Sequence, residues 1–341
     1  MININLAIIG AGRMGKLHAN NFNHIHSSNV KAIVDTEEEL GIELANEVDA
    51  EYYNDIQNVF DDESIDAIVI ATPILTHKDF IIEGIKAGKH VFCEKPLTLT
   101  MENANEIKNV IESHNKKFQL AFMRRFDEDF LFAKNKIEKG AIGTPVFIRS
   151  TGRDPGLPPV PGWGAEPEKC GDISFELCSH DYDSMRWMFD DEVTEVYAKS
   201  DILSSHKEAE LTGGKMISDT LVISLQFSRG ALGSVDGLLN IKYGYDARME
   251  IVGDQGVLLI GTPNYNNVVL GTNNKVLESI SSPSFIDRFK NAYVKEAEHF
   301  IHCILNDEEP KVGINDGLEA VRIAYKVNES IDINKPVQLR R

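Results

Sequence analysis

The sequence predicts an α/β protein with an N-terminal, doubly wound parallel sheet and a C-terminal α+β domain built on a large, mainly antiparallel sheet. Three observations support this fold class. Over residues 1–122, short apolar runs without alternation take turns with helical patterns. From residue 123 onward the strand patterns are longer and alternate polar with apolar residues. The chain has 341 residues, enough for two cores, so we place the domains at 1–122 and 123–341.

The apolar runs of the N-terminal part have no more than seven residues each, which is typical of strands buried on both faces of a parallel sheet. They are Leu6–Gly10, Val30–Asp35, Asp66–Thr72, His90–Glu94 and Phe118–Met123. Between them we expect helices, including one over His77–Ala87 that ends at Gly88 and one capped by Thr100. Repeated strand–helix–strand units imply right-handed crossovers and a doubly wound sheet.

The C-terminal part predicts longer strands with one face covered by helices. The strand candidates are Pro145–Thr151, Val193–Ile202, Ser218–Ser228, Ala231–Ile241 and Ala247–Gly261, the last with a hairpin turn at Gly253–Gly256. Residues 152–171 hold five prolines and five glycines and predict a loop. Two helices close the chain, one starting at Ser284 with Asp287 in a capping-box arrangement and one starting near Asp316.

Composition excludes several classes of partner and site. The formal net charge of −18 disfavours nucleic acid and anionic membranes. The four cysteines form no C-x-x-C pair, so we expect neither a disulfide framework nor a metal site. The first residues lack the basic segment of a signal peptide, and no apolar run is long enough to span a bilayer. These features predict a cytoplasmic protein.

The first motif is a glycine-rich turn, Gly10-Ala11-Gly12-Arg13-Met14-Gly15, between a predicted strand and a predicted helix. Gly10 permits a tight turn, Gly12 lets a pyrophosphate approach the backbone, and Gly15 lets helix and strand pack closely. The helix N-terminus then offers free N–H groups to phosphates. In this context the motif predicts a dinucleotide site in a Rossmann domain.

Asp35 supports that interpretation, because it ends the second apolar run, 20 residues beyond Gly15. A carboxylate at this place accepts hydrogen bonds from the adenosine ribose and repels a 2′-phosphate. The following residues, 36–39, contain no Arg or Lys to hold that phosphate. The pattern therefore predicts NAD as the cofactor and disfavours NADP.

Two further segments carry candidate catalytic groups. Glu94-Lys95-Pro96 follows the run His90–Glu94, at the sheet edge where doubly wound proteins bind ligands. Lys95 there can donate to a substrate hydroxyl, although an isolated lysine is more often a solvated surface charge. Residues 172–189 predict one helix, on which spacings of four and three place Glu176, His180 and Asp183 on one face.

Together with Ala71-Thr72-Pro73, these motifs resemble the Gfo/Idh/MocA oxidoreductase family, and within it the inositol 2-dehydrogenases. The resemblance covers essentially the whole chain. It implies a Rossmann domain followed by an α+β domain whose mainly antiparallel sheet is open-faced and often used for oligomerisation. It also implies a nicotinamide cofactor, a cyclic polyol or sugar as substrate, and a homodimer or homotetramer.

The resemblance assigns roles to individual residues. His180 matches the general acid/base, Lys95 the catalytic lysine and Asp183 a downstream carboxylate that contacts substrate. The family pattern has Asp where this chain has Glu176, whose carboxylate reaches about 1.5 Å further. The remaining substrate contacts that it implies are Arg124 of FMRRFD, Asp154 of the proline loop and Tyr245 of YGYD, whereas Gly152 stands where other branches have a substrate-binding His. The expected cofactor contacts are Gly10, Gly12, Arg13, Met14, Gly15, Asp35, Ala71, Thr72, Pro73, His77, Glu94, Lys95, Arg124 and Trp163.

The sequence therefore predicts NAD-dependent oxidation of a secondary hydroxyl of a cyclic, inositol-type polyol to the ketone. One alternative is a dehydrogenase of an aldopyranose or another sugar derivative from the same family. A second alternative, from a different class, is a non-catalytic NAD-binding sensor. The presence of both Lys95 and His180 argues against the sensor.

Overall fold

The computed structural model describes residues 3–160, 162–261, 270–272, 275–278 and 282–339, without the side chains of residues 163, 270–272 and 275–278. It contains two compact units. The first comprises Met1–Phe126 and Asn291–Val321, and the second comprises Asp127–Lys290 and Arg322–Arg341. The chain thus returns to the first unit near its end, a crossing that no local pattern in the sequence indicates.

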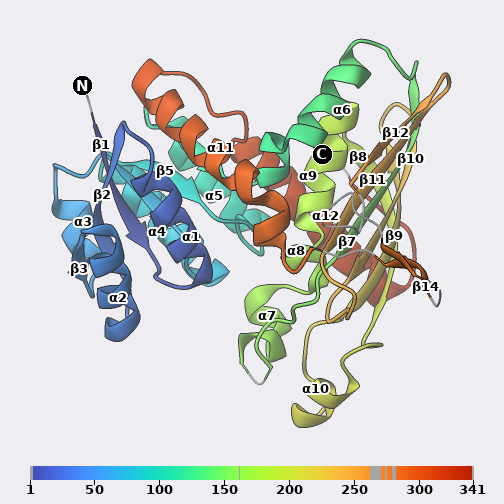
Figure 1. The fold of residues 1–341 in the computed structure, drawn as a ribbon, viewed down its shortest axis with the longest axis horizontal. Helices are drawn as coiled ribbons and strands as arrows, with labels where there is room; N and C mark the ends of the chain where they lie inside the picture. Colours follow the sequence, from blue (N-terminus) through green and yellow to red (C-terminus); the bar gives the residue numbers. More distant parts are fainter. Residues whose placement is uncertain (1–2, 161, 262–269, 273–274, 279–281, 340–341) are drawn as a thin grey trace. The chain divides into compact units, whose positions relative to one another are not determined.

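The first unit contains a six-stranded parallel sheet in the order β3-β2-β1-β4-β5-β6. Figure 1 labels its strands β1, β2, β3 and β5. The strands are β1 (Ile4–Ile9), β2 (Ser28–Val34), β3 (Glu51–Tyr53), β4 (Ala67–Ile70), β5 (His90–Cys93) and β6 (Phe118–Leu120). This order is that of the Rossmann fold, and it reverses direction between β1 and β4. The predicted doubly wound sheet is confirmed, but the sequence did not indicate the short edge strand β3.

Helices lie on both faces of this sheet. They are α1 (Arg13–Asn23), α2 (Glu38–Val48), α3 (Gln57–Asp61), α4 (Ile74–Lys86), α5 (Met101–Glu112) and the 3-10 helix η1 (Met123–Phe126). As predicted, Thr100 caps α5 by accepting the N–H of Asn103, and Gly88, with φ +78°, follows the end of α4. The long helices α11 (Phe285–Asn306) and α12 (Ile314–Ile333) contribute residues to both units. Asp287 donates its N–H to Ser284 at the start of α11, which confirms the predicted cap.

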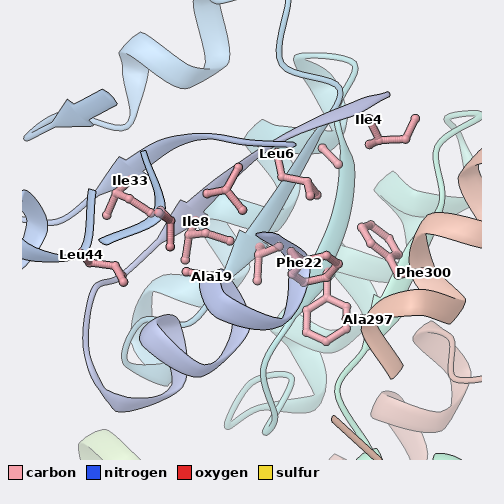
Figure 2. Packing of buried hydrophobic residues seen from close by; sticks show 14 of the residues in the cluster. Ile4, Leu6, Ile8, Ala19, Phe22, Ile33, Leu44, Ala297 and Phe300 are labelled. Atoms are coloured by element: carbon pink, nitrogen blue, oxygen red, sulfur yellow. The ribbon is translucent and has the colours of Figure 1, made fainter. Parts of the chain in front are cut away.

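Apolar side chains of alternate strand positions form the core on one face of the sheet (Figure 2). Leu6 and Ile8 of β1 are fully buried there against Phe22 of α1 and Phe300 of α11. On the other face, α4 approaches so closely that a Cβ on Gly84 would lie 2.5 Å from the side chain of Ile68. Burial on both faces explains why the strands show no polar alternation.

The second unit contains a seven-stranded sheet in the order β12-β11-β7-β10-β9-β8-β15. Its strands are β7 (Pro145–Arg153), β8 (Val193–Asp201), β9 (Thr220–Phe227), β10 (Leu232–Leu238), β11 (Asp246–Gly253), β12 (Val257–Ile260) and β15 (Val337–Gln338). All pairs are antiparallel except β7–β10, so the mainly antiparallel sheet is confirmed. The hairpin between β11 and β12 closes through the N–H of Gly253 and the carbonyl of Gly256. A separate antiparallel pair joins β13 (Leu270–Thr272) to β14 (Lys275–Glu278).

The helices of the second unit correct two predictions. They are α6 (Glu128–Glu138), η2 (Trp163–Ala165), α7 (Pro167–Cys170), α8 (Ile173–Glu176), α9 (Ser179–Phe189) and α10 (His206–Leu211). The predicted loop 152–171 therefore contains short helices. The single helix predicted over 172–189 is wrong, because it breaks at Leu177 and Cys178, where the N–H of Cys178 bonds five residues back to Ile173.

Among the described residues, no helix has both the length and the apolar character that crossing a bilayer requires.

Candidate functional site

The glycine-rich turn lies at the point where the strand order of the first sheet reverses, between the carboxyl ends of β1 and β4. Gly10 has φ +99°, and a Cβ there would lie 2.7 Å from the carbonyl oxygen of Ala71. A Cβ on Gly15 would lie 1.8 Å from the carbonyl oxygen of Gly10. At both positions a side chain would collide with the backbone of this same chain, so both require glycine, as the spacing predicts.

Gly12 differs from these two glycines because its missing side chain faces open space. A Cβ there would meet no described atom within 4 Å. Gly12 is the N-cap residue of α1, and no side chain caps that helix end. The turn therefore leaves room beside the N-terminus of α1, at Arg13 and Met14, where a phosphate can lie.

Asp35 follows β2 and holds the glycine-rich turn. Its carboxylate accepts the N–H of Ala11 at 2.6 Å and the N–H of Glu37 at 2.8 Å. A carboxylate has about four lone-pair sites, so two or so stay available for ligand hydroxyls. The side chain is half-buried and therefore reachable from solvent.

The Ala71-Thr72-Pro73 segment and the Glu94-Lys95-Pro96 loop are joined by His77. Its Nδ1 lies 2.9 Å from the carbonyl oxygen of Pro96, and its Nε2 lies 2.9 Å from the carbonyl oxygen of Thr72. His77 is 1% exposed and both its nitrogens face the backbone, so it holds these two segments together. The contact of His77 with the cofactor stays a prediction.

His18 is a site-forming residue that the sequence reasoning missed. It lies on α1 with no exposed surface, and its Nε2 is 2.7 Å from Oε1 of Glu94. Glu94, predicted as a cofactor contact, is 7% exposed, and its other oxygen accepts the N–H of Lys95. A polar residue on the apolar face of α1, one turn before Phe22, was the available indication.

The arginine pair after β6 separates into two environments. Arg124 is 1% exposed within η1, whereas Arg125 forms an ion pair with Asp316 at 2.6 Å. Arg125 thereby ties η1 to the start of α12. The contact of Arg124 with substrate and cofactor stays a prediction.

In the second unit, α9, the helix that carries His180, packs closely on the sheet because three strand positions are glycine. A Cβ on Gly237 would lie 2.6 Å from Sγ of Cys178, and one on Gly152 would lie 3.0 Å from Oδ2 of Asp181. A Cβ on Gly233 would lie 2.8 Å from the side chain of Met185. Because these three residues have no side chains, α9 can approach the sheet closely. This packing fixes the distance of the α9 residues from the sheet.

His180 and Asp183 both lie on α9. Because they are three residues apart, their side chains are neighbours on the helix surface. His180 is 9% exposed and Asp183 is fully buried. Glu176 ends α8 before the break, so the spacing argument no longer places it on the same face as His180. Asp181, which the sequence analysis did not single out, accepts the hydroxyl of Ser150 at 2.6 Å and anchors α9 to β7.

The other predicted substrate contacts of the second unit lie in ordered segments. Asp154 closes a turn by accepting the N–H of Gly156 at 2.6 Å. Tyr245 is 4% exposed and packs edge-on against Phe285 and Phe289. The side chain of Trp163 lies outside the described part of the chain.

Two domain models match nearly the whole chain. The oxidoreductase family, NAD-binding Rossmann fold, matches residues 4–122, and the oxidoreductase family, C-terminal alpha/beta domain, matches residues 134–339. The chain belongs to the Gfo/Idh/MocA oxidoreductase family. It is therefore an NAD-binding oxidoreductase, which confirms the predicted family, fold class and cofactor.

Individual members of the Gfo/Idh/MocA family resemble the chain along its full length. An uncharacterized oxidoreductase of Bacillus subtilis (strain 168), YrbE, is 36% identical over 97% of this chain and 95% of its own. Myo-inositol 2-dehydrogenase of Thermotoga maritima is 32% identical over 98% of both chains. The crystal structure of scyllo-inositol dehydrogenase from Lactobacillus casei with bound NAD(H) and scyllo-inositol is 29% identical, with a TM-score of 0.90 over 99% of both chains.

The first unit of this Gfo/Idh/MocA member fits NAD. The open space at Gly12 and the uncapped start of α1 fit the pyrophosphate, and the available oxygens of Asp35 fit the ribose hydroxyls. Glu37, Glu38 and Glu39 follow Asp35 and are exposed, so their charges disfavour a 2′-phosphate.

Proposed function

We propose that this protein oxidises a secondary hydroxyl of a cyclic, inositol-type polyol to the ketone with NAD. The observation that carries the proposal is the presence of Lys95, His180 and Asp183 in a chain that is similar to myo-inositol 2-dehydrogenase over 98% of its length. A solved relative holds both NAD(H) and scyllo-inositol, so the same fold accommodates both molecules at once. A non-catalytic NAD sensor has no need of the lysine and the histidine.

The proposed reaction requires a hydride acceptor, a general base and a hydrogen-bond donor to the reacting oxygen. Bound NAD supplies the hydride acceptor. His180 takes the hydroxyl proton as the carbonyl forms, a role suited to imidazole near neutral pH. Lys95 donates a hydrogen bond to the same oxygen and stabilises its developing negative charge. The products are the ketone, NADH and one proton.

The carboxylates have supporting roles in this proposal. Asp183 is buried three residues after His180 and contacts substrate together with Arg124, Asp154 and Tyr245. Glu176 orients His180, Lys95 or a substrate hydroxyl. The remaining cofactor contacts in the proposal are Arg13, Met14, Ala71, Thr72, Pro73, Glu94, Lys95, Arg124 and Trp163.

We also propose a homodimer or homotetramer that buries the outer face of the second sheet. Leu232 on β10, Val222 on β9 and Leu259 on β12 are 52–73% exposed. The strand registers place all three on the face opposite Gly152 and Gly237. Light scattering should give two or four times the chain mass of 38.0 kDa, and a monomer at micromolar concentration would contradict this.

We place the protein in the cytoplasm, because its four cysteines, all within the described residues and all buried, form no disulfide. Thiols persist in a reducing compartment. Fractionation of the source cells with a specific antibody should find the protein with cytoplasmic markers. Recovery with secreted proteins would contradict this assignment.

The experiment that tests the proposed activity measures initial rates of NADH formation across inositol isomers and common aldopyranoses, in parallel with NADP. We expect turnover of at least one inositol isomer, with NAD strongly preferred. Turnover of aldopyranoses alone would keep the hydride chemistry and overturn the inositol assignment. Tight NADH binding without any turnover would favour the sensor.

A further inference from the structure

Two buried histidines from different helices hold the loop that carries Lys95. His18 comes from α1 and contacts Glu94, the residue before Lys95. His77 comes from α4 and contacts Pro96, the residue after Lys95. Neither histidine has been assigned a role in the proposed chemistry above.

The contact of His18 has a defined direction. Because a carboxylate only accepts, Nε2 of His18 donates to Oε1 of Glu94 over 2.7 Å. Nδ1 of His18 has no hydrogen-bond partner among the described residues, which suits the tautomer with the proton on Nε2. Oε2 of Glu94 accepts the backbone N–H of Lys95 at 3.1 Å. By fixing the Glu94 carboxylate, His18 therefore also restrains the backbone at Lys95.

An aromatic cluster fixes the His18 ring. The ring centroids of Phe92 and Tyr293 lie 5.0 and 6.2 Å away, both edge-on, and that of Phe22 lies 6.4 Å away. A ring packed in this way has one orientation, so its Nε2 marks a fixed point for the Glu94 carboxylate.

His77 constrains the other side of the lysine. Burial lowers the pKa of His77, so its ring is neutral at pH 7 and carries one N–H. That N–H donates to the carbonyl of Pro96 or to the carbonyl of Thr72, both 2.9 Å from a ring nitrogen. The ring therefore lies between the Glu94–Pro96 loop and the Ala71–Pro73 segment.

We propose that His18 and His77 are positioning residues that clamp the backbone on both sides of Lys95. The inference rests on the proposed function, in which the Lys95 ammonium donates to the reacting oxygen. A lysine side chain is long and flexible, so its ammonium is well placed only if its backbone is fixed. Misplacement by about 1 Å can cost on the order of 10²-fold in rate.

The kinetic test uses three variants of α1. His18→Phe keeps a ring in the aromatic cluster but loses the donor, whereas His18→Gln keeps a side-chain N–H. Phe22→Leu disturbs the same cluster without touching Glu94 and serves as the control for stability. We expect His18→Phe to lower kcat about tenfold or more, by a larger factor than it raises the NADH Kd, and His18→Gln to recover most of that loss.

His77 is tested in the same way. His77→Asn keeps an N–H near the place of Nδ1, whereas His77→Leu removes both nitrogens. We expect His77→Asn to retain more kcat than His77→Leu at equal NADH affinity. If His18→Phe lowers kcat no more than Phe22→Leu does, or if neither amide variant recovers kcat, the clamp is overturned.

A spectroscopic readout separates failure of the clamp from failure of the proposed function. Lysines are ¹³C-methylated in the full-length protein, and the Lys95 resonance is identified by its loss in Lys95→Arg. We expect this resonance to move in His18→Phe and to return toward its original position in His18→Gln. An unmoved Lys95 resonance in His18→Phe overturns the clamp, even if the wild-type enzyme oxidises no polyol.

Discussion

Glycines shape both units, but they make room for different things. In the first unit, a Cβ on Gly12 would meet none of the described atoms within 4 Å, and this space adjoins a helix start that Gly12 does not cap. In the second unit, the space beside Gly237 is filled by Cys178, and the space beside Gly152 borders Asp181. The first arrangement leaves room for a ligand, and the second lets a helix that carries the candidate acid/base pack on the sheet.

This difference distinguishes the residues proposed to bind NAD from the helix that carries the proposed general base. The groups that we propose for holding the NAD pyrophosphate and ribose are the glycine-rich turn and Asp35, all within the first unit. His180 and Asp183 belong to the second unit and depend on the packing of α9. Substitutions in the glycine-rich turn should therefore affect mainly NADH affinity, and substitutions in α9 mainly turnover.

The largest expected effect is on turnover, from the second unit. His180→Ala should lower kcat about 10²–10⁴-fold, because it removes the proposed general base. NADH affinity, measured by fluorescence titration, should change less than twofold, since the nucleotide cradle is untouched. The companion change, Lys95→Ala, should also lower kcat more than it weakens NADH binding. Unchanged turnover in His180→Ala would refute its assignment.

The next largest effect concerns the glycine-rich turn. Gly15→Ala puts a Cβ 1.8 Å from the Gly10 carbonyl oxygen, so it should lower the free energy of unfolding by about 3 kcal/mol or more. Gly12→Ala meets no atom of the described residues within 4 Å, so it should leave the free energy of unfolding unchanged while weakening NADH binding about tenfold or more. Urea unfolding and NADH titration measure the two quantities. Equal NADH affinity in Gly12→Ala and wild type would show that the open space is not the phosphate site.

A moderate effect is expected beneath α9. Gly237→Ala puts a Cβ 2.6 Å from Sγ of Cys178, so it should lower the free energy of unfolding by about 1–3 kcal/mol. Because Cys178→Ala removes that sulfur, the double variant should be more stable than the sum of the single effects, with a coupling of about 1 kcal/mol. A double-mutant cycle by urea unfolding measures this coupling. Simple additivity would mean that Cys178 is not what Gly237 accommodates.

The smallest expected effect distinguishes the two units by pH. Burial lowers the pKa of His90 and of His299 to about 4, and both belong to the first unit. Each ring nitrogen accepts a backbone N–H, from Lys117 and Lys311 respectively, which a protonated nitrogen cannot do. The unfolded chain binds protons at these groups near pH 6.5, so acidification from 6.5 toward 4 favours unfolding.

We expect His90→Asn, whose side-chain oxygen can accept the same N–H, to lose less stability than wild type between pH 6.5 and 4.5. Thermal unfolding at the two pH values measures this. In the second unit, burial tends to raise the pKa of Asp219, but the N–H groups of Leu203 and Ser204 lower it on balance. Its contribution is therefore present above pH 3.8 and lost only below that value, as the pH falls through the lowered pKa. An identical pH dependence in His90→Asn and wild type would contradict the assignment to His90.

Much of the first unit could be predicted because its motifs are local. The turn Gly10–Gly15, Asp35 and the cap at Thr100 each depend on residues close in sequence. The edge strand β3 was missed because Glu51–Tyr53 is only three residues long and has no buried side chain. His18 was missed because its partner, Glu94, lies 76 residues away.

In the second unit, more of the site depends on contacts between residues far apart in the sequence, which local patterns do not predict. The break at Leu177 and Cys178 contains neither glycine nor proline, so nothing local predicts it. The seat of α9 depends on Gly152, Gly233 and Gly237, whose partners lie on another element. Spacing alone placed Glu176 with His180, and only the path of the backbone shows that the two belong to different helices.

The most direct test of the account is the fate of the hydrogen at the carbinol carbon. The enzyme is incubated with NAD and a C-deuterated inositol, and the NADH formed is analysed by mass spectrometry. Direct hydride transfer predicts NADH one mass unit heavier than from unlabelled inositol, together with slower turnover. NADH of unchanged mass, or no NADH from any inositol isomer, would contradict the proposed oxidation.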